Sequence, residues 1–210
     1  MQERKRGRFI VLEGIDGCGK STQIERLAER LRAEGREVAV TAEPTDSASG
    51  KMLRAALSGA DRRGPCEMAA LFLLDRIYHN VSENGIEAML AKGIDVICDR
   101  YYYSSLAYQG SETDFAWVRD MNLACPEIRR PDLCLFLDVE PRVSLARIAA
   151  SRTSTEIYEK EELLEKFRAR FLEVFAMLKE TDRVAVVDAS RDVDEVAEAV
   201  YRAVKENAEI

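Results

Sequence analysis

The sequence has 210 residues, of which 47% are hydrophobic and 33% charged, and its formal net charge at pH 7 is −7. A chain of this length folds as one α/β domain, or at most as a core with small insertions, and it can bury a sizeable core. The acidic balance argues against a general nucleic-acid-binding protein, and no stretch approaches the roughly 18 apolar residues that cross a membrane.

The cysteines and the first residues bear on the cellular compartment. The five cysteines form no C-x-x-C pair, and Cys98 and Cys134 stand inside apolar runs. This usage is typical of buried thiols in a reducing cytosol rather than of a disulfide framework. Residues 1–8 are charged and have no apolar core, which argues against a secretory signal peptide. We therefore expect a cytoplasmic protein.

Apolar runs alternate with amphipathic stretches along the whole chain. The predicted strands are residues 9–13, 37–42, 95–98, 133–138 and 183–188. The predicted helices are residues 22–34, 49–57, 67–81, 160–179 and 194–207, with a further helix that begins at Pro141. Such alternation predicts a five-stranded parallel sheet with helices on both faces and ligands at the carboxyl ends of the strands. The acidic residues at these ends are Glu13, Glu43, Asp99, Asp138 and Asp188.

Residues 9–23, FIVLEGIDGCGKSTQ, read as a strand, a glycine-rich turn and the start of a helix. The turn fits G-x-x-x-x-G-K-[ST], the phosphate-binding P-loop. Gly14 and Gly19 permit backbone angles that let the loop N–H groups surround an anion at the helix N-terminus. Lys20 then reaches the β- and γ-phosphates, and the Ser21 hydroxyl can bind Mg²⁺. The predicted ATP-binding residues are Gly14, Ile15, Asp16, Gly17, Cys18, Gly19, Lys20, Ser21 and Thr22.

Two stretches in the first half carry candidate ligand-binding residues. Phe72 and Arg76 are four residues apart in LFLLDRIYH and share one helix face. A flat heterocycle could stack on the ring and accept hydrogen bonds from the guanidinium, although a core phenylalanine beside a solvated arginine would show the same spacing. Arg54 is either solvated or functional. His79, the only histidine, is expected to be structural or capping.

Asp99 directly follows a predicted strand and is a candidate Mg²⁺ ligand, directly or through water. Asp138 also follows an apolar strand, and the residues alone do not decide between the two. Arg100 would add positive charge close to a transferred phosphoryl group. The polar and aromatic residues that follow suit a nucleoside pocket; they are Ser104, Ser105, Tyr108, Gln109 and Gly110.

Arg147 and Arg152 bracket the end of the helix that begins at Pro141, and residues 153–159 have no consistent period. A mobile cover that carries arginines would exclude water and neutralise charge on a transferred phosphoryl group. A basic helix end stabilised by the helix dipole is the other interpretation.

Taken together, these motifs resemble those of the thymidylate kinases, which transfer the γ-phosphate of ATP to dTMP. The motifs occur in the family's order over about residues 9–188: FIVLEGIDGCGKSTQ, EPT, LFLLDR, DRYYYSSLAYQG and an arginine-bearing lid before FRARFLEVF. A P-loop alone would indicate only a nucleotide-binding protein, whereas LFLLDR and DRYYYSSLAYQG together are more specific. The resemblance implies a single P-loop kinase domain over residues 1–210, a small lid at about residues 148–160, Mg²⁺-dependent in-line transfer that gives dTDP, and a homodimer.

The resemblance also implies roles for individual residues. Phe72 would stack on thymine, Arg76 would donate to a thymine carbonyl, and Tyr108 would pack under the sugar and disfavour a ribose 2′-OH. Asp99 is favoured over Asp138 for the metal. Pro44 resembles a proline that the family often holds in cis. The other implied contacts are Asp16 near the acceptor sugar and phosphate, Arg54 and Arg100 on the acceptor phosphate, and Ser105 and Gln109 at the base. The implied catalytic residues are Lys20, Asp99, Arg100, Arg147 and Arg152.

The chain departs from the family pattern at three places. Ala42 stands where many bacterial members carry an arginine, and Gly17 stands where some members carry a catalytic arginine inside the P-loop. The lid also ends differently at residues 157–159, so either Arg147 or Arg152 could contact the transferred group.

Two alternatives to this activity remain open. One is a P-loop kinase for another nucleoside monophosphate. The other is a nucleotide-dependent binding switch. A guanine-binding switch would need an Asn-Lys-x-Asp element, and the sequence contains none.

Overall fold

Five parallel strands form one sheet in the order β2-β3-β1-β4-β5, in a computed structural model that describes residues 6–151 and 158–207. The strands are β1 (Phe9–Glu13), β2 (Val38–Ala42), β3 (Asp95–Asp99), β4 (Leu133–Asp138) and β5 (Val184–Asp188). β1 pairs with β3 and β4, and the edge strands β2 and β5 pair with β3 and β4 respectively. The predicted five-stranded parallel sheet is confirmed.

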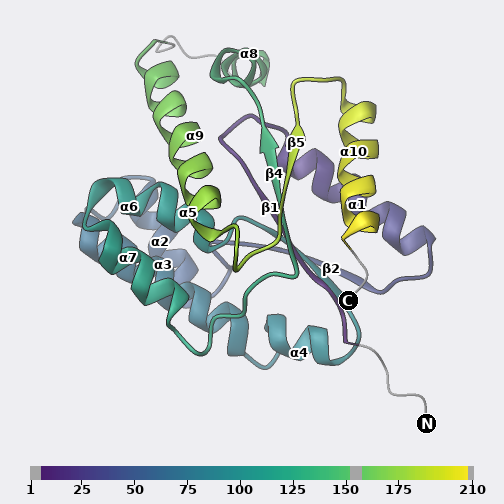
Figure 1. The fold of residues 1–210 in the computed structure, drawn as a ribbon. Helices are drawn as coiled ribbons and strands as arrows, with labels where there is room; N and C mark the ends of the chain where they lie inside the picture. Colours follow the sequence, from purple (N-terminus) through teal and green to yellow (C-terminus); the bar gives the residue numbers. More distant parts are fainter. Residues whose placement is uncertain (1–5, 152–157, 208–210) are drawn as a thin grey trace.

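Helices cover both faces of this sheet. Figure 1 shows α1 and α10 on one side, and α3, α5, α7 and α9 on the other. None of the described helices is long and apolar enough to cross a membrane. The helices are α1 (Lys20–Ala33), α2 (Ala48–Leu57), α3 (Pro65–Val81), α4 (Ile86–Ala91), α5 (Tyr102–Ala107), α6 (Gln109–Glu112), α7 (Phe115–Leu123), α8 (Pro141–Ser151), α9 (Tyr158–Leu178) and α10 (Val193–Glu206).

The helices α4 to α7 were not among the predicted elements. All six residues of α5 are buried, including Tyr102, Ser104 and Ser105. A helix that is buried on every side has no polar face, so its sequence YYSSLA shows no helical period. The helices α4 and α6 have six and four residues, which is too short for a periodic pattern to stand out.

The core lies on the three central strands. Every residue of β1 is buried, and so are the first five residues of β4 and the first four of β3. Central parallel strands are covered on both faces, which explains why they read as continuous apolar runs. The edge strands β2 and β5 are partly exposed, as at Val40 and Val186.

The carboxyl ends of the strands form the edge where the predicted ligand-binding residues gather. β1 leads into the P-loop, and α1 begins at Lys20 directly after it. β2 ends at Ala42 and is followed by a cis peptide bond between Glu43 and Pro44. β3 ends at Asp99 and leads directly into Arg100.

Candidate active site

The P-loop has the backbone that its glycines predict. Gly14, Gly17 and Gly19 have φ angles of 150°, 78° and 100°. Gly19 is the N-cap of α1 and supplies no side-chain hydrogen bond, so the first N–H groups of the helix remain available to an anion. Lys20 is 8% exposed, and its Nζ donates to the carbonyl oxygens of Gly14 (3.0 Å) and Ile15 (3.4 Å). These weak neutral acceptors hold the ammonium beside the loop, where a phosphate would compete for it.

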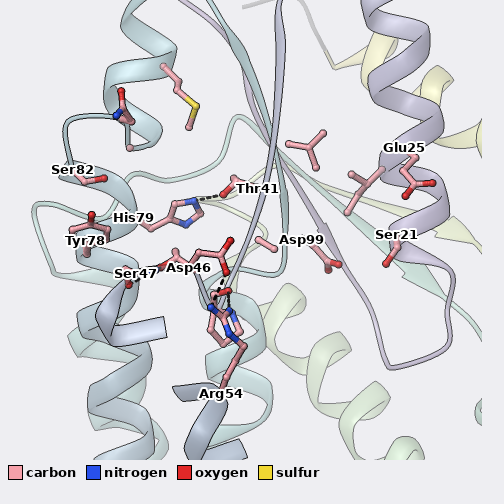
Figure 2. Close-up of a pocket in the computed structure, with 18 residues that line it drawn as sticks. Ser21, Glu25, Thr41, Asp46, Ser47, Arg54, Tyr78, His79, Ser82 and Asp99 are labelled. Atoms are coloured by element: carbon pink, nitrogen blue, oxygen red, sulfur yellow. Dashed lines mark hydrogen bonds and ion pairs between the residues drawn. The ribbon is translucent and has the colours of Figure 1, made fainter. Parts of the chain in front are cut away.

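A cavity of about 780 Å³, here called the Asp99 cavity, is lined by Ser21, Arg54, His79 and Asp99 among others (Figure 2). One carboxylate oxygen of Asp99, Oδ1, is buried and has no hydrogen-bond partner among the described residues. Both oxygens of Asp138, in contrast, accept from Arg168, at 2.6 and 2.8 Å. The geometry therefore favours Asp99 over Asp138 as a metal ligand, because Asp99 has a carboxylate oxygen with no partner among the described residues.

The residues around this cavity fit a magnesium ion. Within residues 6–151 and 158–207, no group of three or more His, Cys, Asp or Glu side chains could hold a metal by itself. Mg²⁺ needs no such group, because it is commonly bound by one or two protein oxygens together with waters and substrate phosphates. Ser21 and Asp99 supply a hydroxyl and an orphaned carboxylate oxygen beside the P-loop.

A second cavity of about 540 Å³, here called the Arg76 cavity, brings together most of the predicted acceptor-binding residues. Its lining includes Asp16, Phe72, Arg76, Arg100, Tyr108 and Gln109. Phe72 is half-buried and faces this space, whereas Leu73 and Ile77 pack against the core. The alternative of a core phenylalanine is therefore not what the fold shows.

Arg76 is 1% exposed, so the alternative of a solvated arginine is wrong. Nε and Nη2 donate to one oxygen of Glu43, at 2.9 and 2.6 Å. Nη1 donates to Ser105 (3.2 Å) and to Asn122 (2.5 Å). Ser105 thus lies behind the guanidinium and is not among the cavity's lining residues, contrary to the expected contact with a base edge. A guanidinium has five N–H donors, and these four bonds leave one of them for a ligand.

Arg100 has an unusual backbone. Its φ of 67° is the only positive value at a non-glycine residue in the described chain, and the left-handed region costs an ordinary residue about 1–2 kcal/mol. Its guanidinium donates to Asp16 (2.5 Å), Ser104 (3.1 Å) and Tyr108 (3.4 Å). Strain of this kind persists only where the surroundings hold it, and it is concentrated at functional sites.

Glu13 is the residue that holds this turn. Its buried carboxylate accepts from the backbone N–H groups of Tyr101 (2.8 Å) and Ser104 (3.1 Å) and from the Ser104 hydroxyl (2.7 Å). Burial raises the pKa of Glu13, and the Arg100 guanidinium opposes that rise. Sequence reasoning noted Glu13 and Glu43 as strand ends but gave them no role. Their position at the carboxyl end of a strand was the signal. Asn122, inside α7, gave none.

Arg54 lies apart from the Arg76 cavity. Its side chain is partly exposed and donates to the Pro44 carbonyl (2.9 Å) and to Asp46 (2.8 Å), as Figure 2 shows. Arg54 lines the Asp99 cavity, whereas Arg100 lines the Arg76 cavity, and Pro44 borders both.

A third cavity of about 300 Å³ lies on the other side of the P-loop and is lined by Cys18, Thr22, Arg147 and Arg191 among others. Arg147 donates to the carbonyl oxygens of Cys18 (3.4 Å) and Arg191 (3.3 Å). Arg152, the other predicted lid arginine, lies outside the described residues. Of the two, the geometry describes only Arg147.

Helix α8 packs directly on the P-loop at Gly17. A Cβ atom built there would lie 2.7 Å from the Ser144 carbonyl oxygen and 2.8 Å from Ile148 Cγ1. The Ser144 hydroxyl also donates to the carbonyl oxygen of Asp16. With α8 in this position, the loop has no room for a side chain at residue 17.

Comparison with known proteins gives a consistent result over nearly the whole chain. Residues 12–200 match the family model for thymidylate kinase. A probable thymidylate kinase of Pyrococcus horikoshii is 40% identical over 207 residues, which cover 95% of this chain and 97% of the relative. One from Archaeoglobus fulgidus is 39% identical and covers 94% of both chains. The thymidylate kinase of Bifidobacterium longum is 37% identical and covers 96% of this chain and 99% of its own.

The contact between α8 and the P-loop gives a testable prediction. Gly17→Ala should destabilise the protein by about 2–4 kcal/mol, because it adds a steric clash to the cost of a left-handed alanine. Gly19→Ala is the matched control, since its φ is also positive but nothing lies within 4 Å of its Cβ position. It should cost only about 1–2 kcal/mol. Thermal or urea unfolding of both variants checks this, and equal losses would mean that α8 does not press on the loop.

Proposed function

We propose that this chain, which belongs to the thymidylate kinase family and phosphorylates dTMP to dTDP, binds dTMP in the Arg76 cavity and ATP along the P-loop. The observation that carries the proposal is the convergence of Phe72, Arg76, Arg100 and Tyr108 on one cavity next to the P-loop. These residues supply an aromatic plane, a directed donor, a phosphate-binding charge and a wall for the sugar.

In the proposed complex, thymine stacks on Phe72 and accepts a hydrogen bond from Arg76. Four N–H groups of Arg76 are engaged by Glu43, Ser105 and Asn122, so the base meets a donor whose direction is fixed. Thymine offers a carbonyl oxygen at the edge where cytosine carries an amino group. A donor that faces another donor in a buried site costs about 1–3 kcal/mol, which favours dTMP over dCMP.

The sugar and the acceptor phosphate lie between Tyr108 and the two arginines in this proposal. The Tyr108 ring packs against Phe167 at a centroid distance of 4.4 Å, which fixes it as a wall against a 2′-OH. Arg100 and Arg54 pair with the exposed carboxylates of Asp16 and Asp46. Ion pairs with such exposed partners contribute only about 0–1 kcal/mol, so a phosphate dianion can replace them. Asp16 then stays near the sugar and phosphate, and Gln109 borders the base.

The donor side consists of residues 14–22 and the α1 N-terminus. ATP is the donor that family membership implies. Lys20 exchanges its bonds to the loop carbonyls for the β- and γ-phosphates. Ser21 and Asp99 would hold Mg²⁺, which neutralises charge on the phosphates as the transfer proceeds. Within the protein, catalysis is in-line positioning and charge stabilisation, with Arg100 on the acceptor side.

The proposal retains one kinase domain over residues 1–210, with a lid at about residues 148–160. Residues 152–157 of that lid lie outside the described chain. Arg147 is favoured as the lid-side arginine that has a described contact with the P-loop, at the Cys18 carbonyl. All five cysteines are free thiols, which favours a reducing compartment, so the proposed location is the cytoplasm.

The first prediction from this proposal concerns the metal. Asp99→Asn should raise the Mg²⁺ concentration for half-maximal activity by at least about tenfold, since it removes the negative charge from the only buried carboxylate oxygen that lacks a partner among the described residues. Asp138→Asn breaks an ion pair with Arg168 and should leave the Mg²⁺ dependence unchanged. Lys20→Ala should lose turnover at every Mg²⁺ concentration. Titration of activity with Mg²⁺ tests all three, and an equal shift in both Asp variants would refute the assignment.

The second prediction concerns the acceptor. The parent enzyme should prefer dTMP strongly over dCMP, and it should use dUMP poorly but detectably, because a single methyl group contributes only about 1–3 kcal/mol. Arg76→Ala should collapse the dTMP to dCMP ratio of kcat/KM. Tyr108→Ala should narrow the gap between dTMP and the ribonucleotide of thymine. An unchanged base ratio in Arg76→Ala would mean that another residue reads the base.

Arg76→Ala also leaves Glu43 without its buried partner, which lowers the stability of the folded protein. Arg76→Lys is therefore measured beside it, because lysine keeps the positive charge but lacks the planar fork of donors. A folded Arg76→Lys enzyme should show the same loss of base preference.

The third prediction concerns assembly, since we propose a homodimer. Leu74, Tyr78 and Val81 are 53%, 52% and 49% exposed at successive turns of α3, which makes an apolar stripe. Sedimentation at micromolar concentration should give the mass of two chains. Tyr78→Asp should shift this to one chain. Val186→Asp, on the edge strand β5 and 58% exposed in the parent, should remain dimeric. A one-chain mass for the parent would contradict the proposal.

A further inference from the structure

We propose that His79 is a positioning residue for base recognition, which acts through Glu43 on Arg76. The inference rests on the proposed binding of thymine by Arg76. His79 itself lines the Asp99 cavity and not the Arg76 cavity, so it does not touch the base in the proposed complex. Figure 2 shows its ring directed at Thr41.

A continuous chain of hydrogen bonds joins the two cavities. Thr41 Oγ1 lies 2.7 Å from His79 Nε2, and His79 Nδ1 lies 3.1 Å from Glu43 Oε1. The other oxygen, Oε2, accepts both bonds from Arg76. His79, Glu43 and Arg76 are all buried, which limits the access of solvent to these atoms. Among the described residues, each carboxylate oxygen of Glu43 has one partner residue.

The spacing of both elements produces this arrangement. Arg76 and His79 are three residues apart on α3 and face the same way. Thr41 lies in β2, and Glu43 directly follows its last residue, Ala42; both side chains contact the His79 ring. The side chains of Arg76 and His79 on the helix thus face those of Glu43 and Thr41: Arg76 contacts Glu43, and His79 contacts both Glu43 and Thr41.

In the tautomer of His79 that carries its proton on Nδ1, Nδ1–H donates to Glu43 and the Thr41 hydroxyl donates to Nε2. The negative charge of Glu43 then pairs with the positive charge of Arg76 alone. Without a donor at Nδ1, Glu43 Oε1 would be a buried carboxylate oxygen with no partner, and such an atom is costly enough to turn the side chain toward another donor.

A rotation of the Glu43 carboxylate would change the direction of the Arg76 N–H that faces the base in the proposed complex. Nη2 of Arg76 carries the N–H that remains free for a ligand, and the same nitrogen donates its other N–H to Glu43. The carboxylate of Glu43 therefore sets the plane in which the free N–H points. Asn122 and Ser105 hold only the opposite nitrogen, Nη1. His79 consequently influences which base edge is accepted without contacting the base.

Two substitutions of nearly equal size separate this role from simple packing. The amide nitrogen of asparagine can occupy the place of Nδ1, so His79→Asn keeps a donor to Glu43. The longer His79→Gln places its amide at the position of Nε2 and loses that donor. We expect His79→Gln to lower the dTMP to dCMP ratio of kcat/KM by roughly tenfold. His79→Asn should stay within threefold of the parent, and KM for ATP should not change in either.

Asn80→Ala is the matched structural control. Asn80 is the next residue on α3 and is buried, but its side chain bonds to Tyr101, Arg129 and the Arg76 carbonyl rather than to Glu43. It should lower the melting temperature and leave the base ratio unchanged. Should the His79 variants fail to fold, Thr41→Val removes the outer hydroxyl of the chain at the sheet edge, and it should lower the base ratio roughly threefold with KM for ATP unchanged.

The outcomes separate this inference from the function on which it rests. If Arg76→Lys collapses the base ratio while His79→Gln leaves it unchanged, the positioning role is wrong and the proposed function stands. If His79→Asn and His79→Gln lose the ratio equally and raise KM for ATP as well, His79 is structural and the inference is overturned. If Arg76→Lys leaves the ratio unchanged, the proposed base reader itself fails.

Discussion

The site depends on the pairing of two adjacent buried charges on α3 with the segment that follows β2. Arg76 donates twice to Glu43, while Asp75 accepts from the backbone and hydroxyl of Thr45 and from the hydroxyls of Ser47 and Ser49. Breaking a buried pair by removing one partner costs about 3–5 kcal/mol. The helix and the end of the strand therefore hold each other in a single register. That register also positions the Arg76 cavity, because one wall of the cavity comes from α3 and another from the segment after β2.

Other buried polar groups of the site also have unused hydrogen-bonding capacity. Arg76 keeps one free N–H, Asp99 Oδ1 has no partner among the described residues, and Lys20 is bonded only to the neutral Gly14 and Ile15 carbonyls and the Cys18 sulfur. The described contacts hold Arg76 and Lys20 in place before a ligand arrives, and neither contact set includes a phosphate or a base. Such preorganisation lowers the cost of ordering side chains on binding. The strained backbone of Arg100 is held in a similar way, because Glu13 accepts three hydrogen bonds from the residues that follow Arg100.

Sequence patterns predicted the parts of this structure that depend on local or periodic information. Strands β1 and β4 have the predicted bounds, because central strands are continuous apolar runs. Helix α5 escaped prediction because it is buried on all sides and has no period. The pairing of Arg76 with Glu43 joins residues 33 positions apart, and no spacing rule reaches that far. The pairing of Asp138 with Arg168, which makes Asp99 the better candidate ligand, likewise joins a strand end to a helix late in the chain.

The departure at Gly17 has a structural counterpart in α8. Ser144 and Ile148, which occupy the space next to Gly17, are four residues apart and share one face of the helix. Arg147, three residues after Ser144, donates from the same helix to the Cys18 carbonyl of the loop. An arginine at position 17 and this packing of α8 are mutually exclusive, since the Cβ alone would overlap the Ser144 backbone. The helix that excludes a side chain from the loop thus brings its own arginine to the P-loop. In the proposed function, Arg147 of α8 would supply the positive charge beside the phosphates.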